Sequence, residues 1–359
     1  MSSAADARPV RDEDAFDVDV LDAWLREQLA AAGEQAPPPG PPEARQFAGG
    51  ASNLTYLLRY PDRELILRRP PEGTKAASAH DMVREHRIQQ ALKPVFPYVP
   101  AMVALCTDEA VLGSDFYVME RVDGVIPRTT MPQEAGTEPA LMRALGDRFV
   151  DLLVELHGID PADAGLSDLG RGAGYVTRQV AGWSDRYTRA KTWNVPSFKP
   201  VMRWLDERQP HDVRTCVIHN DYRLDNVVLD PTDPLRIRGV LDWELATLGD
   251  PLMDLGSAMA YWIRPDDGRL SQQLRMQPSY LPGMPTRQQI VERYCAATGL
   301  DPGDWPFYEV YGMFRLAGIA QQIYYRYAKG QTTNPKFKRY WVIVHVLERR
   351  CRAVMRAAA

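Results

Sequence analysis

The chain has 359 residues, of which 45% are hydrophobic and 25% charged, as in an ordinary globular protein. Its formal net charge of -4 argues against the strong positive field of a nucleic-acid-binding protein. No stretch approaches the roughly 18 apolar residues that a membrane-spanning helix needs, so we expect no membrane association.

The four cysteines predict a reducing compartment. Cys106, Cys216, Cys295 and Cys351 lie far apart and form no Cys-x-x-Cys pair. The polar, acidic start of the chain has no apolar segment of export length, so no signal peptide is expected. Free thiols are the usual state in the cytoplasm, where we expect the protein to reside.

The first third of the chain alternates helix and strand patterns. Leu21, Leu25 and Leu29 recur at helical spacing, and the run "LTYLLRYPDRELILRR" predicts two strands around a turn at Pro61–Asp62. The expected elements are a helix at 16–30, a Pro-rich connector at 36–42, strands within 47–69, a helix at 78–92 and strands within 99–108 and 115–124.

Beyond Gly124 the pattern becomes mainly helical. Helices are expected at 139–157, 175–190, 197–208, 251–263, 286–298, 305–328 and 338–356, with short strands at 215–219, 226–229 and 237–242. We therefore predict an α+β fold in three parts: an N-terminal helix and connector (1–42), a small strand-rich lobe (43–122) and a larger, mainly helical lobe (123–359).

One polar loop lies between two apolar runs, in "VIHNDYRLDNVVLD" (217–230). Polar groups near a core need partners, so the loop is either a hydrogen-bonded turn or a site. Asp221 lies in this loop, Asn226 opens the next strand and Asp242 ends the strand after it. Such oxygen donors suit Mg²⁺ bound through substrate phosphates, and a free carboxylate can accept a hydroxyl proton. Simple turn capping by each aspartate stays open.

These motifs resemble a known family. "HNDYRLDN" matches the catalytic loop of protein kinases, and "LDWE" stands where that fold carries its metal-binding Asp-Phe-Gly. With "FAGGASNLTYLL", "YVMERVDG" and "GVLDWELATLGDPLMDLG", they resemble the aminoglycoside and choline phosphotransferases. Within that group the chain is most similar to the kinase-like domains associated with acyl-CoA dehydrogenases. The resemblance implies a protein-kinase-like bilobal fold and phosphoryl transfer that depends on ATP and Mg²⁺.

The resemblance also implies roles in the large lobe. Asp221 would be the catalytic base, and Arg223 would act beside it on the transferring phosphate. Asn226 and Asp242 would bind Mg²⁺. Asp250 and Asp254 would tie the start of a helix to the catalytic loop, a role that nearly coincides with simple helix capping.

The small lobe would bind the nucleotide. Gly50, Ser52 and Asn53 lie in a turn whose backbone N–H groups can cover phosphates, although a plain hairpin turn stays open. "VMERV" is similar to the segment that joins kinase lobes, so Glu120 and Val122 would pair with adenine through their backbone.

One departure from protein kinases concerns the third strand, where those enzymes pair a lysine with a helical glutamate. Here the position holds Arg68, with Glu85 as its expected partner. Arginine keeps the charge and offers a fork for phosphate oxygens, but its reach differs. A solvated strand end stays open for Arg68.

The acceptor is expected to be a small molecule. Only eleven residues separate Asp242 from Asp254, too few for a peptide-docking segment. Residues 256–359 hold fifteen Lys/Arg against seven Asp/Glu, which favours an anionic or neutral hydroxyl compound over a polycation. That these basic residues only face solvent on their helices stays open. The family likeness suggests a hydroxyacid or a hydroxyacyl-CoA. Arg315, in an apolar helical context, would bind its negative group, unless an internal salt bridge neutralises the guanidinium.

Two rival functions stay open. One is an aminoglycoside-modifying phosphotransferase, whose pocket beyond residue 256 should be acidic. The other is a catalytically weak nucleotide-binding module that regulates a partner enzyme. The resemblance also implies a functional link to an acyl-CoA dehydrogenase.

Overall fold

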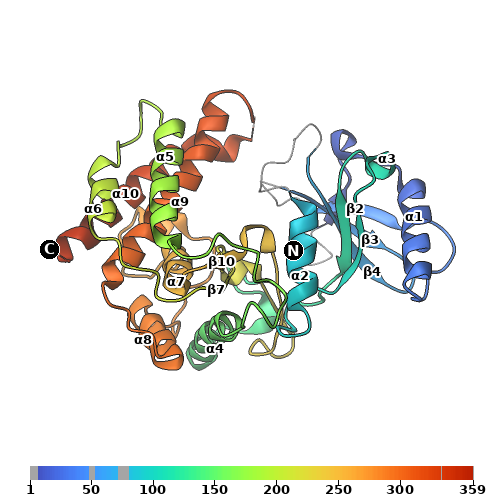
Figure 1. Ribbon diagram of the computed structural model, residues 1–359, viewed down its shortest axis with the longest axis horizontal. Helices are drawn as coiled ribbons and strands as arrows, with labels where there is room; N and C mark the ends of the chain where they lie inside the picture. Colours follow the sequence, from blue (N-terminus) through green and yellow to red (C-terminus); the bar gives the residue numbers. More distant parts are fainter. Residues whose placement is uncertain (1–6, 48–52, 72–80, 333, 359) are drawn as a thin grey trace.

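The computed structural model describes residues 7–47, 53–71, 81–332 and 334–358. A small lobe built on a sheet lies beside a large lobe built mainly of helices (Figure 1). This arrangement confirms the predicted bilobal α+β fold. Gly50 and Ser52, the predicted phosphate-covering residues, lie outside the described residues.

The small lobe contains a six-stranded antiparallel sheet in the order β1-β2-β3-β4-β6-β5. Its strands are β1 (Ala7–Pro9), β2 (Glu43–Phe47), β3 (Leu54–Arg59), β4 (Glu64–Arg69), β5 (Met102–Cys106) and β6 (Phe116–Glu120). β3 and β4 form the predicted hairpin around Pro61–Asp62. The strand pattern predicted from residue 47 is divided differently, because β2 ends at Phe47 and β3 begins at Leu54.

Helices cover both faces of this sheet: α1 (Val18–Ala31) and α3 (Glu109–Leu112) lie on one face, and α2 (Met82–Leu92) on the other (Figure 1). Successive side chains of a strand point to opposite faces. Tyr56 of β3 accordingly packs in the cluster that contains Leu25 of α1, whereas Leu57 packs in the cluster that contains Met82 of α2. The predicted N-terminal helix therefore shares a hydrophobic core with the sheet.

The large lobe confirms each of the seven helices predicted beyond Gly124. They are α4 (Pro139–His157), α5 (Tyr175–Ala190), α6 (Lys199–Glu207), α7 (Pro251–Ala260), α8 (Arg287–Thr298), α9 (Trp305–Ala328) and α10 (Tyr340–Ala357). Two short ribbons pair β7 (Cys216–Ile218) with β10 (Thr247–Gly249) and β8 (Val227–Leu229) with β9 (Ile237–Val240). No helix among the described residues is both long and apolar enough to cross a bilayer.

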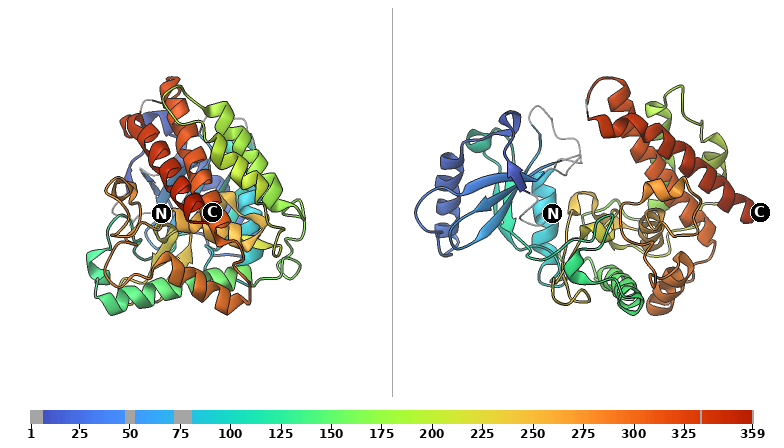
Figure 2. Two further views of the ribbon diagram at one scale, coloured as in Figure 1. Left: turned by 90° about the vertical axis from the view of Figure 1, so that its left-hand side faces the viewer. Right: turned by 180° about the vertical axis from the view of Figure 1, so that it is seen from behind.

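The core of the large lobe is organised around α7 and α9. Every residue of α7 is buried. Gly312 of α9 is needed for close packing, because a Cβ atom there would lie 2.0 Å from the backbone oxygen of Gly256 in α7. α10 packs along α9 (Figure 2). This tight crossing fixes α7, and with it Asp254, beside the loop that follows β7.

Candidate active site

The loop after β7 is held by a buried carboxylate on α7. Asp254 accepts the backbone N–H groups of His219 and Asn220, each at 2.8 Å. His157 Nε2 lies 3.1 Å from the same carboxylate. Burial raises the pKa of Asp254, but these donors outweigh it, so the pKa lies below its ordinary value. Asp254 is therefore a charged anchor for the loop.

Asn220 turns the chain sharply just before Asp221. Its φ of 64° is in the left-handed region, which asparagine tolerates better than most residues. The Tyr175 hydroxyl donates to its side-chain oxygen at 3.1 Å, and its Nδ2 donates to the backbone oxygen of Leu245 at 3.0 Å. Beyond this turn, Asp221 lines a cavity between the lobes.

Asp221, Asn226 and Asp242 come together in this cavity, as the sequence analysis expected. Asn226 Nδ2 donates to the backbone oxygen of Asp221 at 2.9 Å and to its carboxylate at 3.3 Å. The side-chain oxygen of Asn226 is therefore the atom left to face a cation. Asp242 follows β9 in a left-handed conformation with a φ of 70°.

Arg68 connects the two lobes. Its guanidinium lies 3.1 Å from Glu85 of α2, which is the predicted pair. It also lies 3.3 Å from Asp242 and 3.4 Å from Glu244 in the large lobe. Arg68 is buried, so it is not a solvated strand end. Burial raises the pKa of Asp242, but Arg68 and His219 outweigh this effect and hold that pKa below its ordinary value.

Arg223 lies beside the predicted base. Its Nη2 is 3.3 Å from Asp221 Oδ2, and its guanidinium is 4.7 Å from the ring centre of Tyr261. Arg223 also lines the cavity, so a fixed positive charge stands next to Asp221.

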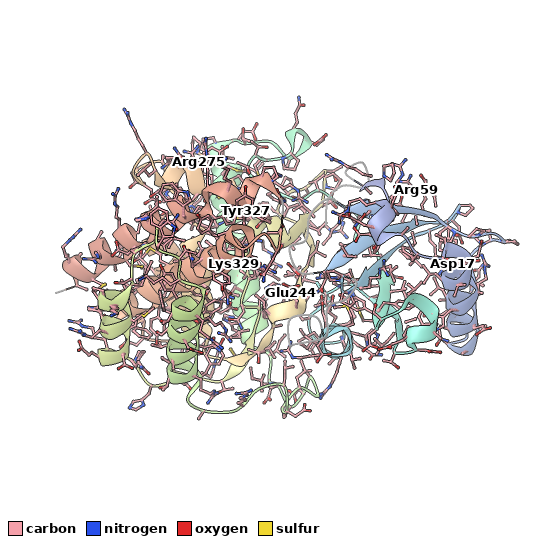
Figure 3. The ribbon with its side chains drawn as sticks, turned by 90° about the horizontal axis from the view of Figure 1, so that it is seen from above. Asp17, Arg59, Glu244, Arg275, Tyr327 and Lys329 are labelled. Carbon is pink, nitrogen blue, oxygen red and sulfur yellow. The ribbon has the colours of Figure 1, made fainter. Side chains whose placement is uncertain are left out.

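Two acidic residues that the sequence motifs did not point to, Glu244 and Asp225, also line the cavity. Glu244 accepts a hydrogen bond from Asn53 Nδ2 at 3.1 Å, and Figure 3 shows Glu244 where the lobes meet. Its place two residues after Asp242, in "LDWE", was the available signal. Asp225 lies 3.3 Å from Arg223, and burial raises the pKa of its carboxyl group. No pattern distinguished Asp225 from an exposed loop residue.

The other predicted nucleotide-binding residues fall in different places. Asn53 lines the cavity. Glu120 ends β6, and its N–H donates to the backbone oxygen of Ala101 at 2.8 Å. Val122 follows in the segment between the lobes. Neither Glu120 nor Val122 is among the described residues that line the cavity.

Arg315 is buried on α9, whereas its neighbour Leu316 lines the cavity. Its guanidinium lies 5.5 Å from the ring centre of Trp183, and it pairs with no carboxylate in the described part of the chain. Burial acts to lower its pKa, but nearby tyrosines and Asp221 outweigh this effect and raise it. The internal salt bridge that the sequence analysis left open is therefore not seen among these residues.

The cavity has a volume of about 630 Å³ and two chemically different ends. At the polar end, the lining residues include Asn53, Arg68, Asp221, Arg223, Asp225, Asn226, Asp242 and Glu244. At the apolar end, they include Leu316, Ile319, Ala320, Ile323, Phe337, Tyr340 and Ile343. Beyond residue 256 the described lining contains Arg275 but no Asp or Glu. This wall is not the acidic surface expected for binding an aminoglycoside.

The donor set at the polar end fits Mg²⁺. This cation prefers oxygen ligands and takes one or two carboxylates together with waters and substrate phosphates. Asp242 supplies a carboxylate that stays ionised, and Asn226 supplies a carboxamide oxygen. Arg68 lies beside them with its charge balanced on the small-lobe side by Glu85.

The fold is that of the protein-kinase-like class, and the chain belongs to the phosphotransferase enzyme family (APH), whose profile matches residues 43–290. Among curated proteins, it is 36% identical to mouse acyl-CoA dehydrogenase family member 10 over 329 residues, covering 91% of this chain and 30% of that protein. It is 33% identical to human acyl-CoA dehydrogenase family member 11 over 338 residues, covering 92% of this chain and 42% of that protein. The chain therefore spans less than half the length of these relatives.

Solved structures give the same result for the fold. A candidate aminoglycoside phosphotransferase from Ralstonia eutropha is 31% identical and matches with a TM-score of 0.76, covering 94% of this chain and 99% of that one. Choline kinase from Cryptosporidium parvum is 11% identical and matches with a TM-score of 0.59, covering 95% and 98%. The second likeness supports the fold alone.

Proposed function

We propose that the protein transfers the γ-phosphoryl group of ATP, with Mg²⁺, to a hydroxyl group of a small molecule. The observation that carries this proposal is the meeting of Asp221, Asn226 and Asp242 with Arg68 in one cavity between the lobes. Phosphoryl transfer needs little covalent chemistry from the protein and depends on positioning and on stabilising negative charge. This cavity offers groups for both.

Each group at the polar end has a proposed role. Asp221 orients the acceptor hydroxyl and accepts its proton, and Arg223 beside it stabilises charge on the transferring phosphate. Asn226 and Asp242 hold Mg²⁺, which neutralises negative charge on the phosphates when it is bound. Arg68, fixed by Glu85, binds phosphate oxygens from the small-lobe side.

We propose that the nucleotide binds against the small lobe. Asn53 and Arg68 line the cavity there, and Gly50 and Ser52, which are predicted to cover phosphates, precede β3 in the sequence. We also propose that the backbone of Glu120 and Val122 contacts adenine, as the resemblance implies, although neither is among the described residues that line the cavity. A related phosphotransferase, APH(4)-Ia, has been solved as a ternary complex with AMP-PNP and hygromycin B, and aminoglycoside 2'-phosphotransferase-IIIa as a GDP complex. These complexes support a nucleotide here, and we propose ATP.

The acceptor lies against α9 and α10. Their cavity-facing side chains are apolar, including Leu316, Ile319 and Ile343, so the acceptor carries an apolar portion. The absence of Asp and Glu among the described lining residues beyond 256 disfavours a polycation. A hydroxyacid or a hydroxyacyl-CoA meets both conditions, and Arg315 supplies a positive charge for its negative group.

A functional link to an acyl-CoA dehydrogenase is part of the proposal. It is supported by the names of the curated relatives, of which this chain corresponds to 30–42% of the length. We place the protein in the cytoplasm, because its four cysteines are free thiols.

A phosphate-transfer screen tests the function. The purified chain is incubated with ATP and Mg²⁺ and with hydroxyacids, their CoA esters, sugars, amino alcohols or aminoglycosides, and ADP release is measured. Hydroxyacids or their CoA esters should react best. Within that series KM should fall about fourfold per added methylene while the chain still contacts the apolar wall, since each buried methylene contributes roughly 0.8 kcal/mol.

Other outcomes of the screen favour the rivals. Preference for aminoglycosides would contradict the proposed acceptor. Mg²⁺-dependent ATP binding without transfer to any acceptor would instead favour the regulatory module.

A further inference from the structure

Three successive backbone carbonyls follow the proposed metal ligand Asp242, in the turn that contains the 3₁₀ helix η5 (Trp243–Leu245). Arg84 of α2 donates Nη1 to the backbone oxygen of Glu244 at 3.3 Å, and Nη2 to the backbone oxygen of Ala246. Asn220 of the catalytic loop donates Nδ2 to the carbonyl between them, that of Leu245, at 3.0 Å. Two different elements therefore hold consecutive peptide groups of one turn.

α2 thus reaches Asp242 by two routes. Glu85 acts on its side chain, because Glu85 pairs with Arg68 at 3.1 Å and Arg68 lies 3.3 Å from the Asp242 carboxylate. Arg84, the preceding residue, acts on the backbone that follows Asp242. Arg84 is half-buried and forms no ion pair with a carboxylate in the described part of the chain, so these carbonyls are its main partners.

The backbone at this point needs such support. Asp242 has a φ of 70° and Asn220 a φ of 64°, and non-glycine residues keep this conformation only where their surroundings hold it. Asn220 is itself held by Asp254 and Tyr175. The turn is therefore fixed on the large-lobe side by Asn220 and on the small-lobe side by Arg84.

We propose that Arg84 is a positioning residue for the metal site: by binding the turn to α2, it holds the Asp242 carboxylate in the orientation that Mg²⁺ requires. This inference rests on the proposed function. Removal of groups that orient a metal ligand typically lowers metal affinity by about 10–100-fold. Arg84 touches neither of the two proposed ligands directly, so its effect passes through the turn.

The same helix offers a matched control. Arg87 also joins α2 to the large lobe, with its guanidinium 2.9 Å and 2.5 Å from the two carboxylate oxygens of Asp168. This pair is exposed, its guanidinium binds Gly165 and Asp168 rather than the carbonyls of η5, and exposed pairs contribute little to stability. Arg84→Met and Arg87→Met each remove one arginine from α2, but only the first releases the turn.

The experiment compares the full chain with Arg84→Met, Arg84→Lys and Arg87→Met. Binding of AMP-PNP is measured over a series of Mg²⁺ concentrations, and backbone hydrogen exchange is followed in peptides covering residues 241–250. Arg84→Met should need about 10–100-fold more Mg²⁺ for half-maximal binding. Its turn should also exchange faster. Arg84→Lys can donate to these carbonyls but lacks the guanidinium fork, so its Mg²⁺ requirement and exchange rate should lie between those of the wild type and Arg84→Met. Arg87→Met should match the wild type in both measurements.

The two readouts separate this inference from the proposed function. Unchanged exchange and unchanged Mg²⁺ requirement in Arg84→Met overturn the inference, as does an equal shift in Arg87→Met, which would indicate general docking of α2. Nucleotide binding by the wild type that is indifferent to Mg²⁺ overturns the proposed metal site. Faster exchange in Arg84→Met would then show that Arg84 still holds the turn, while its role in metal binding would be refuted.

Discussion

At the polar end of the cavity, Arg68 joins Glu85 of the small lobe to Asp242 of the large lobe, whereas at the other end α9 presents Leu316 and Ile319. Buried charges need partners at defined distances, so the polar end depends on a connected network. Apolar contacts are non-directional and scale with area. The difference indicates that changes at the polar end should remove function, and changes at the apolar end should alter acceptor preference.

The largest effect is expected at Asp242. Asp242→Asn keeps a residue that tolerates the φ of 70° but removes the charge that would bind Mg²⁺. Mg²⁺-dependent nucleotide binding should weaken by more than about 100-fold, beyond the range typical of residues that only orient a ligand. Nucleotide titration with and without Mg²⁺ measures it. Trp243→Phe, a change at a buried neighbour, should keep the metal dependence, and a wild-type response in Asp242→Asn would remove Asp242 from the site.

The next effect tests the base. Asp221→Asn should retain nucleotide binding and lower kcat by about 10²–10⁴-fold, the usual contribution of a general base. Asp225→Asn is the matched control, because Asp225 also lies 3.3 Å from Arg223 and lines the cavity. Its kcat should fall less. Steady-state kinetics decides, and an Asp221→Asn enzyme within about threefold of wild type would be incompatible with a base at this position.

The smallest effect is expected for Arg315, which is buried on α9 next to the apolar end of the cavity. Arg315→Met should raise KM for an anionic acceptor by roughly tenfold and leave KM for ATP nearly unchanged, because Arg315 lies behind the described lining and acts through its charge, and about 1.4 kcal/mol of attraction corresponds to tenfold. Added salt should raise the wild-type KM for that acceptor as well. Arg315→Lys keeps the charge and should lose less. Indifference of KM to both salt and Arg315 would contradict the assignment and leave Arg315 a core residue.

Strong periodicity made most elements predictable. The seven helices beyond Gly124 agree with their patterns because each presents a recurring apolar face. β1 (ARP) and β10 (TLG) lack the apolar run that marked the equally short β7 (CVI) and β8 (VVL), and they form through pairing with β2 and β7. The turn predicted around Gly50 marked the start of the hairpin, but no pattern indicated that the residues before it form a strand, β2, which pairs with β3.

The candidate site divides in the same way. Asp221 and Asn226 are neighbours because both lie in one short loop, so their spacing in the sequence was sufficient to group them. The sequence did not reveal that Asn53 donates a hydrogen bond to Glu244, or that Arg84 binds the backbone of the turn after Asp242. In both contacts the donor comes from the small lobe and the acceptor from the large lobe. Leu316 and Ile319 of α9 and Ile343 of α10 are ordinary helix-face residues in the sequence and form one apolar wall only when the helices pack.

The sequence by itself therefore predicted most helices and strands, the grouping of Asp221 with Asn226 in one loop and a bilobal fold, because these depend on local periodicity and on residues a few positions apart. Only the tertiary structure decided that Arg68 reaches Asp242, 174 residues away, and that Arg315 lacks a carboxylate partner among the described residues. The physical reason is that a buried charge is stable only with the partners that packing brings to it, and packing joins segments that no local pattern connects.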